Sequence, residues 1–429
     1  MTQSTQNKNY TLPIAMMFAL FFMVSFVTGL PNPMGVIVKN QFGASNFMST
    51  LGNAANFIAY AFMGLPAGLL LAKIGYKKLA LLAIVVGFVG VGIQYLSGQA
   101  GSFAVYLIGA IVSGFSKCML NTVVNPMLNT LGGGGKKGNQ LIQFGGSINS
   151  IGATIVPVLV GILMGDVLKA NIKDANPALF IAMGIFALAF IVLFTMEIPE
   201  PHMVTGPKST VKDKHSALSF RHFILGTVAI FVYVGVEVGI PNITNLFMTT
   251  AKELGGLGID GSVAGAVCGT YWFFMLLGRL AGASLGAKFS SKSMLIFVST
   301  LGLVLVLAAI FSPIDILVRM PVFQRDISVG LAQVPIGVMF LILVGFCTSV
   351  MWGGIFNLAV EGLGKYTATA SGIFMVMVCG GGILPLIQGA VADNVSYVAS
   401  YWVIFLGLAY MLYYALIGSK NVNTDIPVA

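Results

Sequence analysis

Charged residues are scarce along this chain, and their scarcity excludes a fold that is soluble in water. Only 8% of the 429 residues are Asp, Glu, Lys or Arg, while 57% are hydrophobic. A chain of this composition has too few polar side chains to cover its apolar surface, so folding in water would leave very large apolar patches exposed. The composition therefore indicates a protein whose solvent is a lipid bilayer.

Cysteine and histidine are also few, and their positions argue against metal chemistry. The four cysteines fall within apolar segments at no metal-ligand spacing and behave as small apolar residues: Cys118, Cys268, Cys347 and Cys379. The three histidines lie in or beside one polar stretch: His202, His215 and His222. No Ser/His/Asp set or carboxylate pair converges at membrane depth. We therefore expect no metal, no cofactor and no membrane-embedded enzyme.

Long polar segments are missing as well, which excludes a large soluble domain. The longest polar stretch, 197–219, predicts a cytoplasmic linker between an N-terminal six-helix bundle at 1–196 and a C-terminal six-helix bundle at 220–429. The rest consists of apolar segments of about 20 residues or more, the length that crosses a hydrocarbon core of about 30 Å. They lie near 12–31, 45–71, 79–97, 103–130, 141–164, 178–196, 220–249, 262–287, 293–312, 335–361, 368–391 and 397–417. The predicted fold class is an all-α membrane protein with twelve transmembrane helices.

The basic residues that are present gather in alternate gaps between these segments. Six lie in one set of gaps: Lys39, Lys169, Lys173, Lys252, Arg319 and Arg325. Fourteen lie in the other set: Lys8, Lys73, Lys77, Lys78, Lys136, Lys137, Lys208, Lys212, Lys214, Arg221, Lys288, Lys292, Lys365 and Lys420. Since cytoplasmic loops carry the excess of Lys and Arg, both termini are expected in the cytoplasm. The basic residues form no stripe, so nucleic-acid binding is not expected.

The two halves of the chain contain similar motifs in the same order, as expected of an internal repeat. A Gly, Pro and Gly set in the fifth segment recurs at the same spacing in the eleventh: Gly152, Pro157 and Gly161 match Gly380, Pro385 and Gly389. AGLLLAKIGYKK at 67–78 likewise echoes AGASLGAKFSSKS at 281–293, and the Leu-Gly pair at 131–132 echoes the pair at 363–364. Such repeats predict two pseudo-symmetric bundles that face each other across a central cavity, the design used for alternating access.

Several motifs resemble a known family. GLPAGLLLAKIGYKK at 64–78 resembles the signature loop of the major facilitator superfamily, with Ala72 in place of the usual acidic residue. Further segments resemble the fucose and glucose/galactose proton-symporter branch of that superfamily: LNTVVNPMLNTLG at 120–132, GGSINSIGA at 145–153, FVYVGVEVG at 231–239, GRLAG at 278–282, IFNLAVEGLGKYTATAS at 355–371 and GGGILPLIQGAVAD at 380–393. The resemblance implies a monomeric transporter in a bacterial inner membrane that moves a monosaccharide by alternating access.

The chain departs from this branch at two positions that bear on ion coupling. The resemblance implies a carboxylate in helix one and another in helix four, as protonatable and sugar-contacting groups, but Asn32 and Asn121 stand there. An amide can still bind a sugar hydroxyl but cannot carry a proton. Symport with a proton as co-substrate and uniport without ion coupling therefore both remain open.

Two ionisable residues lie deep within apolar segments, and a charge at membrane depth is costly enough to mark a functional site. Glu237 is a candidate replacement proton carrier or a structural gating residue. Lys117 is a candidate ligand for an acidic group on the substrate, which would favour an acidic sugar such as a sialic or uronic acid. Alternatively, the two form a structural ion pair or are satisfied separately by backbone and water. Arg279 and Glu361 complete the candidates for coupling or gating.

Amide side chains at helical spacing supply a candidate carbohydrate site, because each offers donors and acceptors together. The substrate-binding candidates are Asn32, Asn121, Asn125, Gln143 and Asn149 in the first half and Asn242, Asn245, Asn357 and Gln388 in the second. Trp352, with Tyr271 and Trp272, is a candidate for stacking on a sugar ring. The competing interpretation is that the amides join helices across the membrane and that the aromatics only pack. A drug or lipid exporter is the functional alternative, although it would favour a more apolar cavity.

Overall fold

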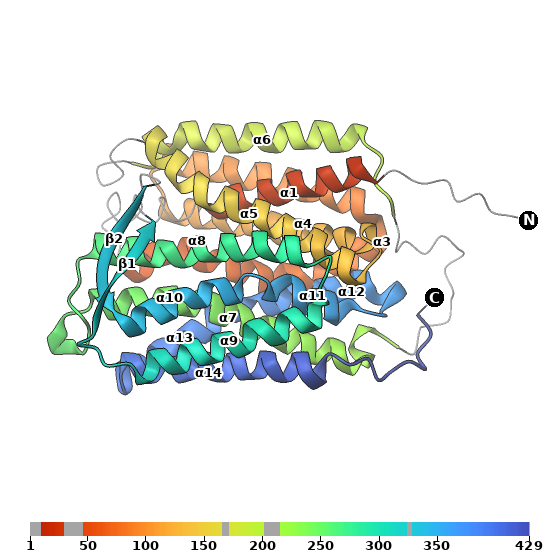
Figure 1. Cartoon of the computed structure of the whole chain (residues 1–429). Coiled ribbons are helices and arrows are strands. Elements are labelled where there is room, and N and C mark those ends of the chain that lie inside the picture. Colours follow the sequence, from red (N-terminus) through yellow and green to blue (C-terminus); the bar gives the residue numbers. More distant parts are fainter. Residues whose placement is uncertain (1–9, 30–45, 165–170, 201–214, 324–327, 429) are drawn as a thin grey trace, which may run out of the picture.

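The computed structural model describes residues 10–29, 46–164, 171–200, 215–323 and 328–428. Apart from short turns, these residues form helices and one β-hairpin (Figure 1). The helices are α1 (Thr11–Gly29), α3 (Asn46–Ala100), α4 (Phe103–Leu131), α5 (Gly135–Met164), α6 (Asn176–Thr195), α7 (Arg221–Thr249), α8 (Gly261–Leu285), α9 (Ser291–Phe311), α10 (Ile336–Thr348), α11 (Met351–Val360), α12 (Thr367–Val376), α13 (Gly380–Asn394) and α14 (Tyr397–Tyr413). The strands are β1 (Leu317–Phe323) and β2 (Val329–Pro335).

The helices follow the predicted apolar segments. Nine helical stretches within the described ranges are long and apolar enough to cross a membrane, and 11–26 is a shorter apolar helix. One stretch covers two predicted segments, because the 55 residues of α3 run through the gap between 45–71 and 79–97. The chain turns back at Gly75, whose φ of 83° lies in the left-handed region that glycine adopts without strain. The prediction of an all-α membrane protein is confirmed.

The second part of α3 begins with a cap that the sequence did not predict. The carboxylate of Glu200, which follows α6, accepts hydrogen bonds from the backbone N–H groups of Tyr76 (2.6 Å) and Lys77 (3.0 Å). These groups lie in the first turn after Gly75, where a helix leaves its N–H donors unpaired. A carboxylate at this position also complements the helix dipole. The start of the linker is thereby fixed to the bend in α3.

The helices form two halves, which lie one above the other in Figure 1. In the N-terminal half, α3 packs on α4 and α6, and α1 packs on α5. In the C-terminal half, α7 packs on α11, α13 and α14, and α9 packs on α10 and α14. The main contacts between the halves are those of α3 with α12 and of α5 with α8. The two bundles are therefore separate packing units joined along two helix pairs.

Many large apolar side chains point away from the protein. Five examples from α3, α6, α9 and α14 are between 62% and 71% exposed: Phe62, Leu188, Phe194, Phe297 and Leu406. Exposure of so many apolar side chains is unfavourable in water but favourable against lipid chains. The outer surface of both halves therefore fits a bilayer.

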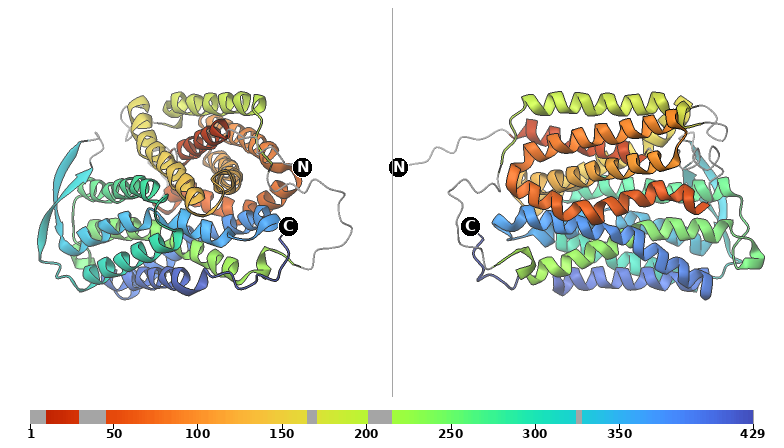
Figure 2. Two further views of the ribbon diagram at one scale, coloured as in Figure 1. Left: turned by 45° about the vertical axis from the view of Figure 1, so that its right-hand side comes forward. Right: turned by 180° about the vertical axis from the view of Figure 1, so that it is seen from behind.

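The hairpin between α9 and α10 was not predicted. Its strands pair in antiparallel register, with Met320 opposite Ala332 and Val322 opposite Gly330. Side chains alternate along the strands, so that Met320, Val322, Ala332 and Val334 are buried. We call the end of the molecule that holds β1 and β2 the hairpin end. The opposite end, where α1 begins and where residues 420–428 lie, is called the terminal end (Figures 1 and 2).

Candidate functional site

A stripe of polar side chains on α4 faces the C-terminal half. Lys117, Asn121, Asn125 and Asn129 follow one another at intervals of four residues, which places them along one side of the helix. The Asn125 side-chain oxygen accepts a hydrogen bond from the indole N–H of Trp352 (3.2 Å), on α11 of the other half. Asn129 donates a hydrogen bond to the side-chain oxygen of Asn357, also on α11. The stripe therefore lies along the boundary between the two halves, and we call the region where the halves face each other the gap.

Within its own half, the stripe is held by hydrogen bonds. The Asn121 amide donates to the hydroxyl oxygen of Tyr60 on α3 (2.5 Å), and Asn125 donates to the backbone oxygen of Asn121 (2.8 Å). Tyr60 is a partner that the sequence analysis missed, since nothing in the sequence indicates which part of α3 packs on α4. The hydrogen bond fixes the rotamer of Asn121 beside the gap.

The proline of α4 makes a second hydrogen bond between the halves possible. Pro126 has no N–H group, so the carbonyl of Thr122 one turn earlier lacks its helical donor. The buried hydroxyl of Ser371 on α12 donates to that carbonyl at 3.2 Å. The link explains why a proline is tolerated inside this helix, five residues before its end.

α7 carries two further amides that were predicted to bind substrate. Gly235 and Gly239 of this helix pack on α13, and Thr244 shares a hydrogen bond with Tyr401 of α14. Asn242 is exposed and Asn245 is half-buried. Since neither side chain bonds to a described residue of the N-terminal half, their contact with substrate stays a prediction.

An ion pair from the C-terminal half also contacts the N-terminal half. Arg279 of α8 lies 3.4 Å from the carboxylate of Glu237 on α7, and each side chain is 14% exposed. The same guanidinium donates to the backbone oxygen of Gly146 (3.2 Å) and to the hydroxyl of Ser150 (2.5 Å), both on α5. It also donates to the backbone oxygen of Ser349 at 3.4 Å. Arg279 therefore joins the two halves.

Lys117 lies near this ion pair but makes no contact with it at salt-bridge distance. Its charge interacts with that of Glu237 through space, yet among the described residues its ammonium group has neither a hydrogen-bond partner nor a salt bridge. The alternative in which Lys117 and Glu237 form a structural ion pair is therefore not what the structure shows, because Arg279 occupies that place. Lys117 is only partly buried.

Contacts between the halves close the gap toward the terminal end. The side-chain oxygen of Asn357 accepts the hydrogen bond from Asn129, as described above. The side-chain amide of Asn357 also donates to the hydroxyl of Ser291 (2.7 Å) and to the backbone oxygen of Gly135 (3.3 Å). The Gln143 amide donates to the backbone oxygen of Val350 at 2.7 Å. Near the same end, Gly68 of α3 and Gly372 of α12 are so close that a Cβ on Gly68 would lie 2.6 Å from the Cα of Gly372. These contacts form a floor beneath the gap.

A comparison with known families assigns this architecture. The family model of the Major Facilitator Superfamily matches residues 17–385, most of the chain. The chain belongs to the major facilitator superfamily.

Curated relatives and solved structures of this superfamily match the chain over most of its length. The glucose/galactose transporter of Brucella abortus is 28% identical over 424 residues, covering 98% of this chain and 97% of the relative. The L-fucose-proton symporter of Escherichia coli is 22% identical over 415 residues, covering 90% of this chain and 88% of the relative. The crystal structure of the superfamily transporter FucP in the outward conformation matches with a TM-score of 0.79 at 20% identity, covering 96% of this chain and 100% of that chain.

Several predicted site residues of this superfamily member lie apart from the stripe. Asn32 falls outside the described residues. Asn149 is half-buried on α5, and Gln388 is fully buried against Gly239, with no hydrogen-bond partner for either amide atom among the described residues. Glu361 is exposed at the end of α11, and its backbone oxygen accepts a hydrogen bond from His222. The gating role assigned to Glu361 stays a prediction.

Two of the predicted aromatic residues lie away from the gap contacts. The Tyr271 hydroxyl is buried against that of Thr348 (3.0 Å), and Trp272 is 42% exposed. Trp352 alone of the three contacts an amide of the other half, Asn125. Trp352 is therefore the aromatic residue best placed to contact a ligand in the gap.

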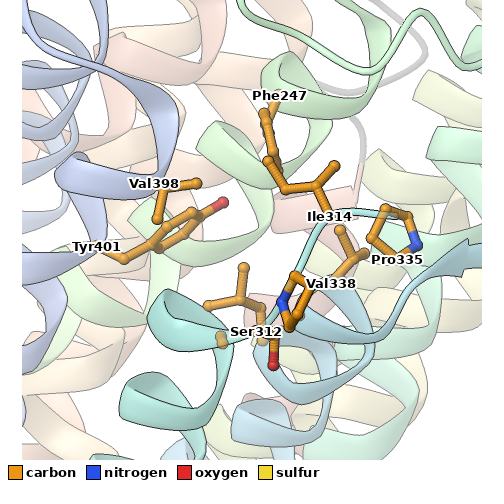
Figure 3. Close-up of a pocket in the computed structure, with 11 residues that line it drawn as sticks. Phe247, Ser312, Ile314, Pro335, Val338, Val398 and Tyr401 are labelled. Atoms are coloured by element: carbon orange, nitrogen blue, oxygen red, sulfur yellow. The ribbon is translucent and has the colours of Figure 1, made fainter. Parts of the chain in front are cut away.

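Figure 3 shows a pocket at the hairpin end that lies within the C-terminal half. Its walls come from α7, α9, α10 and α14, and they are mostly apolar, as with Phe247, Ile314 and Val338. The hydroxyl of Tyr401 at its edge is already bonded to Thr244. A pocket inside one half does not open alternately to the two sides when the halves move, so it is not the candidate transport site of this superfamily member.

Cysteines in place of Asn129 and Asn357 are expected to cross-link, because these side chains touch across the floor. The test uses a variant without the four native cysteines and with a protease site in the linker, so that cleavage separates the halves unless they are joined. Oxidation in the absence of substrate should hold the fragments together and stop transport, and reduction should restore it. A control pair with cysteines at Asn129 and Asn394, which lie near opposite ends, should not cross-link. Separation of the fragments in the first variant would contradict the floor.

Proposed function

We propose that this protein moves a monosaccharide across the bacterial inner membrane through the gap between its halves. The observation that carries the proposal is that amide side chains from both halves border one gap, whose floor is closed at the terminal end. Asn121 on α4 and Asn357 on α11 supply hydrogen-bonding groups of the kind that sugar hydroxyls need, and Asn242 of α7 is a further proposed contact. The names of the relatives, glucose/galactose transporter and L-fucose-proton symporter, support this substrate class.

The excess of basic residues in one set of loops supports an orientation with the terminal end in the cytoplasm. With this orientation, the floor closes the cytoplasmic side, and the gap faces outward. Transport then requires the floor to separate, while the hairpin-end parts of the helices come together. We propose that residues 1–196 and 220–429 move as the two bodies, that 197–219 links them, and that one chain suffices as a monomer.

Gln143, Asn125 and Asn357 have a second role in this proposal. In the structure these amides join the halves, with Val350, Trp352 and Asn129 as their partners. When the floor separates, they lose those partners and become free to bind sugar hydroxyls from the cytoplasmic side. A substrate that replaces these bonds would compensate for opening the floor. The same amides would thus serve the gate and the substrate in different states.

Replacing Asn121 with alanine is expected to lower sugar exchange by about tenfold, because one hydrogen bond to a sugar hydroxyl is worth about 1 kcal/mol and the Tyr60 hydroxyl also loses its partner. Counterflow of labelled hexoses in proteoliposomes measures the exchange. Asn394→Ala, at an exposed position at the end of α13, is the matched control and should leave it unchanged. Equal exchange by the Asn121 variant and the wild type would remove Asn121 from the site.

The same vesicles distinguish symport from uniport. If Glu237 carries the proton, an imposed proton gradient drives accumulation of the sugar, and Glu237→Gln retains counterflow but loses accumulation. If the protein is a uniporter, both the wild type and Glu237→Gln show counterflow without accumulation. In the second case the asparagines at positions 32 and 121 account for the missing coupling, since an amide binds no proton at physiological pH.

A further inference from the structure

The middle of this membrane protein contains more positive than negative charge. The chain has 13 acidic residues, and Glu237 is the one that lies deep inside an apolar helix. The other described acidic residues lie in loops, at the start of the linker, in the C-terminal tail or within two residues of a helix end: Asp174, Glu197, Glu200, Glu253, Asp260, Asp315, Glu361, Asp393 and Asp425. Asp166, Asp213 and Asp326 fall outside the described residues and, in the sequence, outside the predicted apolar segments. Two cations, Lys117 and Arg279, therefore share one carboxylate.

The depth of Lys117 keeps the other described carboxylates out of its reach. Lys117 lies 14 residues from Phe103 and 14 residues from Leu131, the two ends of α4. At a rise of about 1.5 Å per residue, each end is about 21 Å away. A lysine and an aspartate side chain together span well under that distance. The described part of the chain therefore offers no second carboxylate to neutralise Lys117, and an anion from outside the chain fits that place.

Glu237 is already used by Arg279. The guanidinium binds the carboxylate at 3.4 Å and is itself held by Gly146, Ser150 and the backbone of Ser349, so the pair is fixed in place. Lys117 is attracted by the charge of Glu237 through space but forms no hydrogen bond with it. A cation at membrane depth is costly unless it is paired. An anion bound beside the unpaired ammonium group of Lys117 would therefore stabilise it.

The surroundings of Lys117 define the chemistry of that anion. Asn121, one turn along the same stripe, and Trp352, which contacts Asn125, offer hydrogen bonds and an aromatic face. One surplus positive charge is matched by one negative charge, as in a carboxylate, whereas a phosphate monoester carries close to two. We propose that Lys117 binds the carboxylate of an acidic monosaccharide, such as a hexuronate, while the amides bind its hydroxyls. This inference rests on the proposed sugar transport and names its substrate class.

The proposal is tested by competition in counterflow. Unlabelled glucuronate and galacturonate are compared with glucose and galactose as competitors for exchange of labelled sugar, in proteoliposomes that contain the full chain. In the wild type, the uronates are expected to compete at least tenfold better than the neutral sugars. Lys117→Gln should abolish this preference, and Lys117→Arg, which retains the charge, should keep most of it. Lys173→Gln, at an exposed lysine outside the gap, is the matched control and should keep the preference.

The outcomes separate the two proposals. Exchange of neutral hexoses without any preference for uronates would overturn the role of Lys117 and leave monosaccharide transport standing. A uronate preference that survives in Lys117→Gln would also overturn that role. A requirement for chloride in the exchange of neutral hexoses, lost in Lys117→Gln, would make a medium ion the partner of Lys117 and overturn the acidic substrate. Failure of all sugars to exchange in a folded protein would overturn the proposed function itself.

Discussion

Replacement of Arg279 by alanine is expected to abolish transport and to lower the free energy of unfolding by about 3 kcal/mol. The variant leaves the Glu237 carboxylate without the partner that lies 3.4 Å away, at a site where each side chain is only 14% exposed. Breaking a buried ion pair by removing one partner typically costs about 3 to 5 kcal/mol, because an uncompensated charge stays behind. Partial exposure places the expected value at the lower end. Thermal unfolding in detergent and uptake into proteoliposomes measure the two effects.

Transport is expected to suffer more than stability does, because Arg279 also joins the two halves. Its bonds to Gly146 and Ser150 of α5 form in the state with a closed floor and must be exchanged when the halves rearrange. Arg279→Lys retains a positive charge but lacks the planar fork that reaches Glu237 and Ser150 together. We therefore expect this conservative variant to be nearly as stable as the wild type and to transport at least tenfold more slowly.

A double variant separates the two roles of Arg279. Adding Glu237→Gln to Arg279→Ala removes the unpaired charge, so stability should recover while transport stays absent. Arg319→Ala, at an exposed position on β1, is the matched control and should change neither quantity. Wild-type uptake by Arg279→Ala would contradict the assigned role of the link between α8 and α5.

Gly68→Leu is expected to reduce transport to less than a tenth of the wild-type rate. A Cβ on Gly68 would lie 2.6 Å from the Cα and 2.9 Å from the backbone nitrogen of Gly372, distances that side chains do not adopt. The obstructing atoms belong to a helix backbone, which cannot move aside as a flexible side chain can. The halves are therefore held apart at the terminal end, and the floor cannot form. Uptake and the accessibility of a cysteine introduced at Asn357 measure this effect.

The matched control for Gly68→Leu is Gly184→Leu on α6. A Cβ on Gly184 would meet no atom within 4 Å, so the same change of residue should be tolerated there. Gly68→Ala should fall between the two, since it introduces the close contact without the larger side chain. Labelling of the Asn357 cysteine should increase in Gly68→Leu and not in Gly184→Leu. Full transport by Gly68→Leu would show that the contact of α3 with α12 is not part of the transport cycle.

Much of the candidate site was visible in the sequence as a pattern, but its partners were not. The four-residue spacing of Lys117, Asn121 and Asn125 placed them on one side of α4, because a helix repeats every 3.6 residues. The spacing does not say what that side touches. Asn125 was predicted to bind substrate, a role that stays a prediction, and the structure shows its side chain bonded to Trp352. Asn129, the next member of the stripe, could have been included by continuing the same spacing.

Other features were not predictable because they depend on contacts between distant segments. The cap that Glu200 forms on Tyr76 and Lys77 joins residues more than a hundred positions apart. The strands β1 and β2 are short and contain prolines, so their alternation was too weak to distinguish from a loop. The choice of Arg279 over Lys117 as the partner of Glu237 depends on how α7 and α8 are rotated against each other. The rotation of α7 is set by its packing within the C-terminal half, for example of Gly239 against Gln388 of α13.

The sequence by itself determined that this protein is mostly helical, lies in a membrane and repeats one bundle twice. These properties follow from composition, segment length and the spacing of glycines and prolines, each of which acts locally along the chain. The tertiary structure alone decided which polar groups meet: that Glu237 is bound by Arg279, that Lys117 is left with no bonded partner among the described residues, and that the floor closes at the terminal end. Helical periodicity fixes the side of a helix on which a residue lies, but its partner depends on the close packing of whole helices.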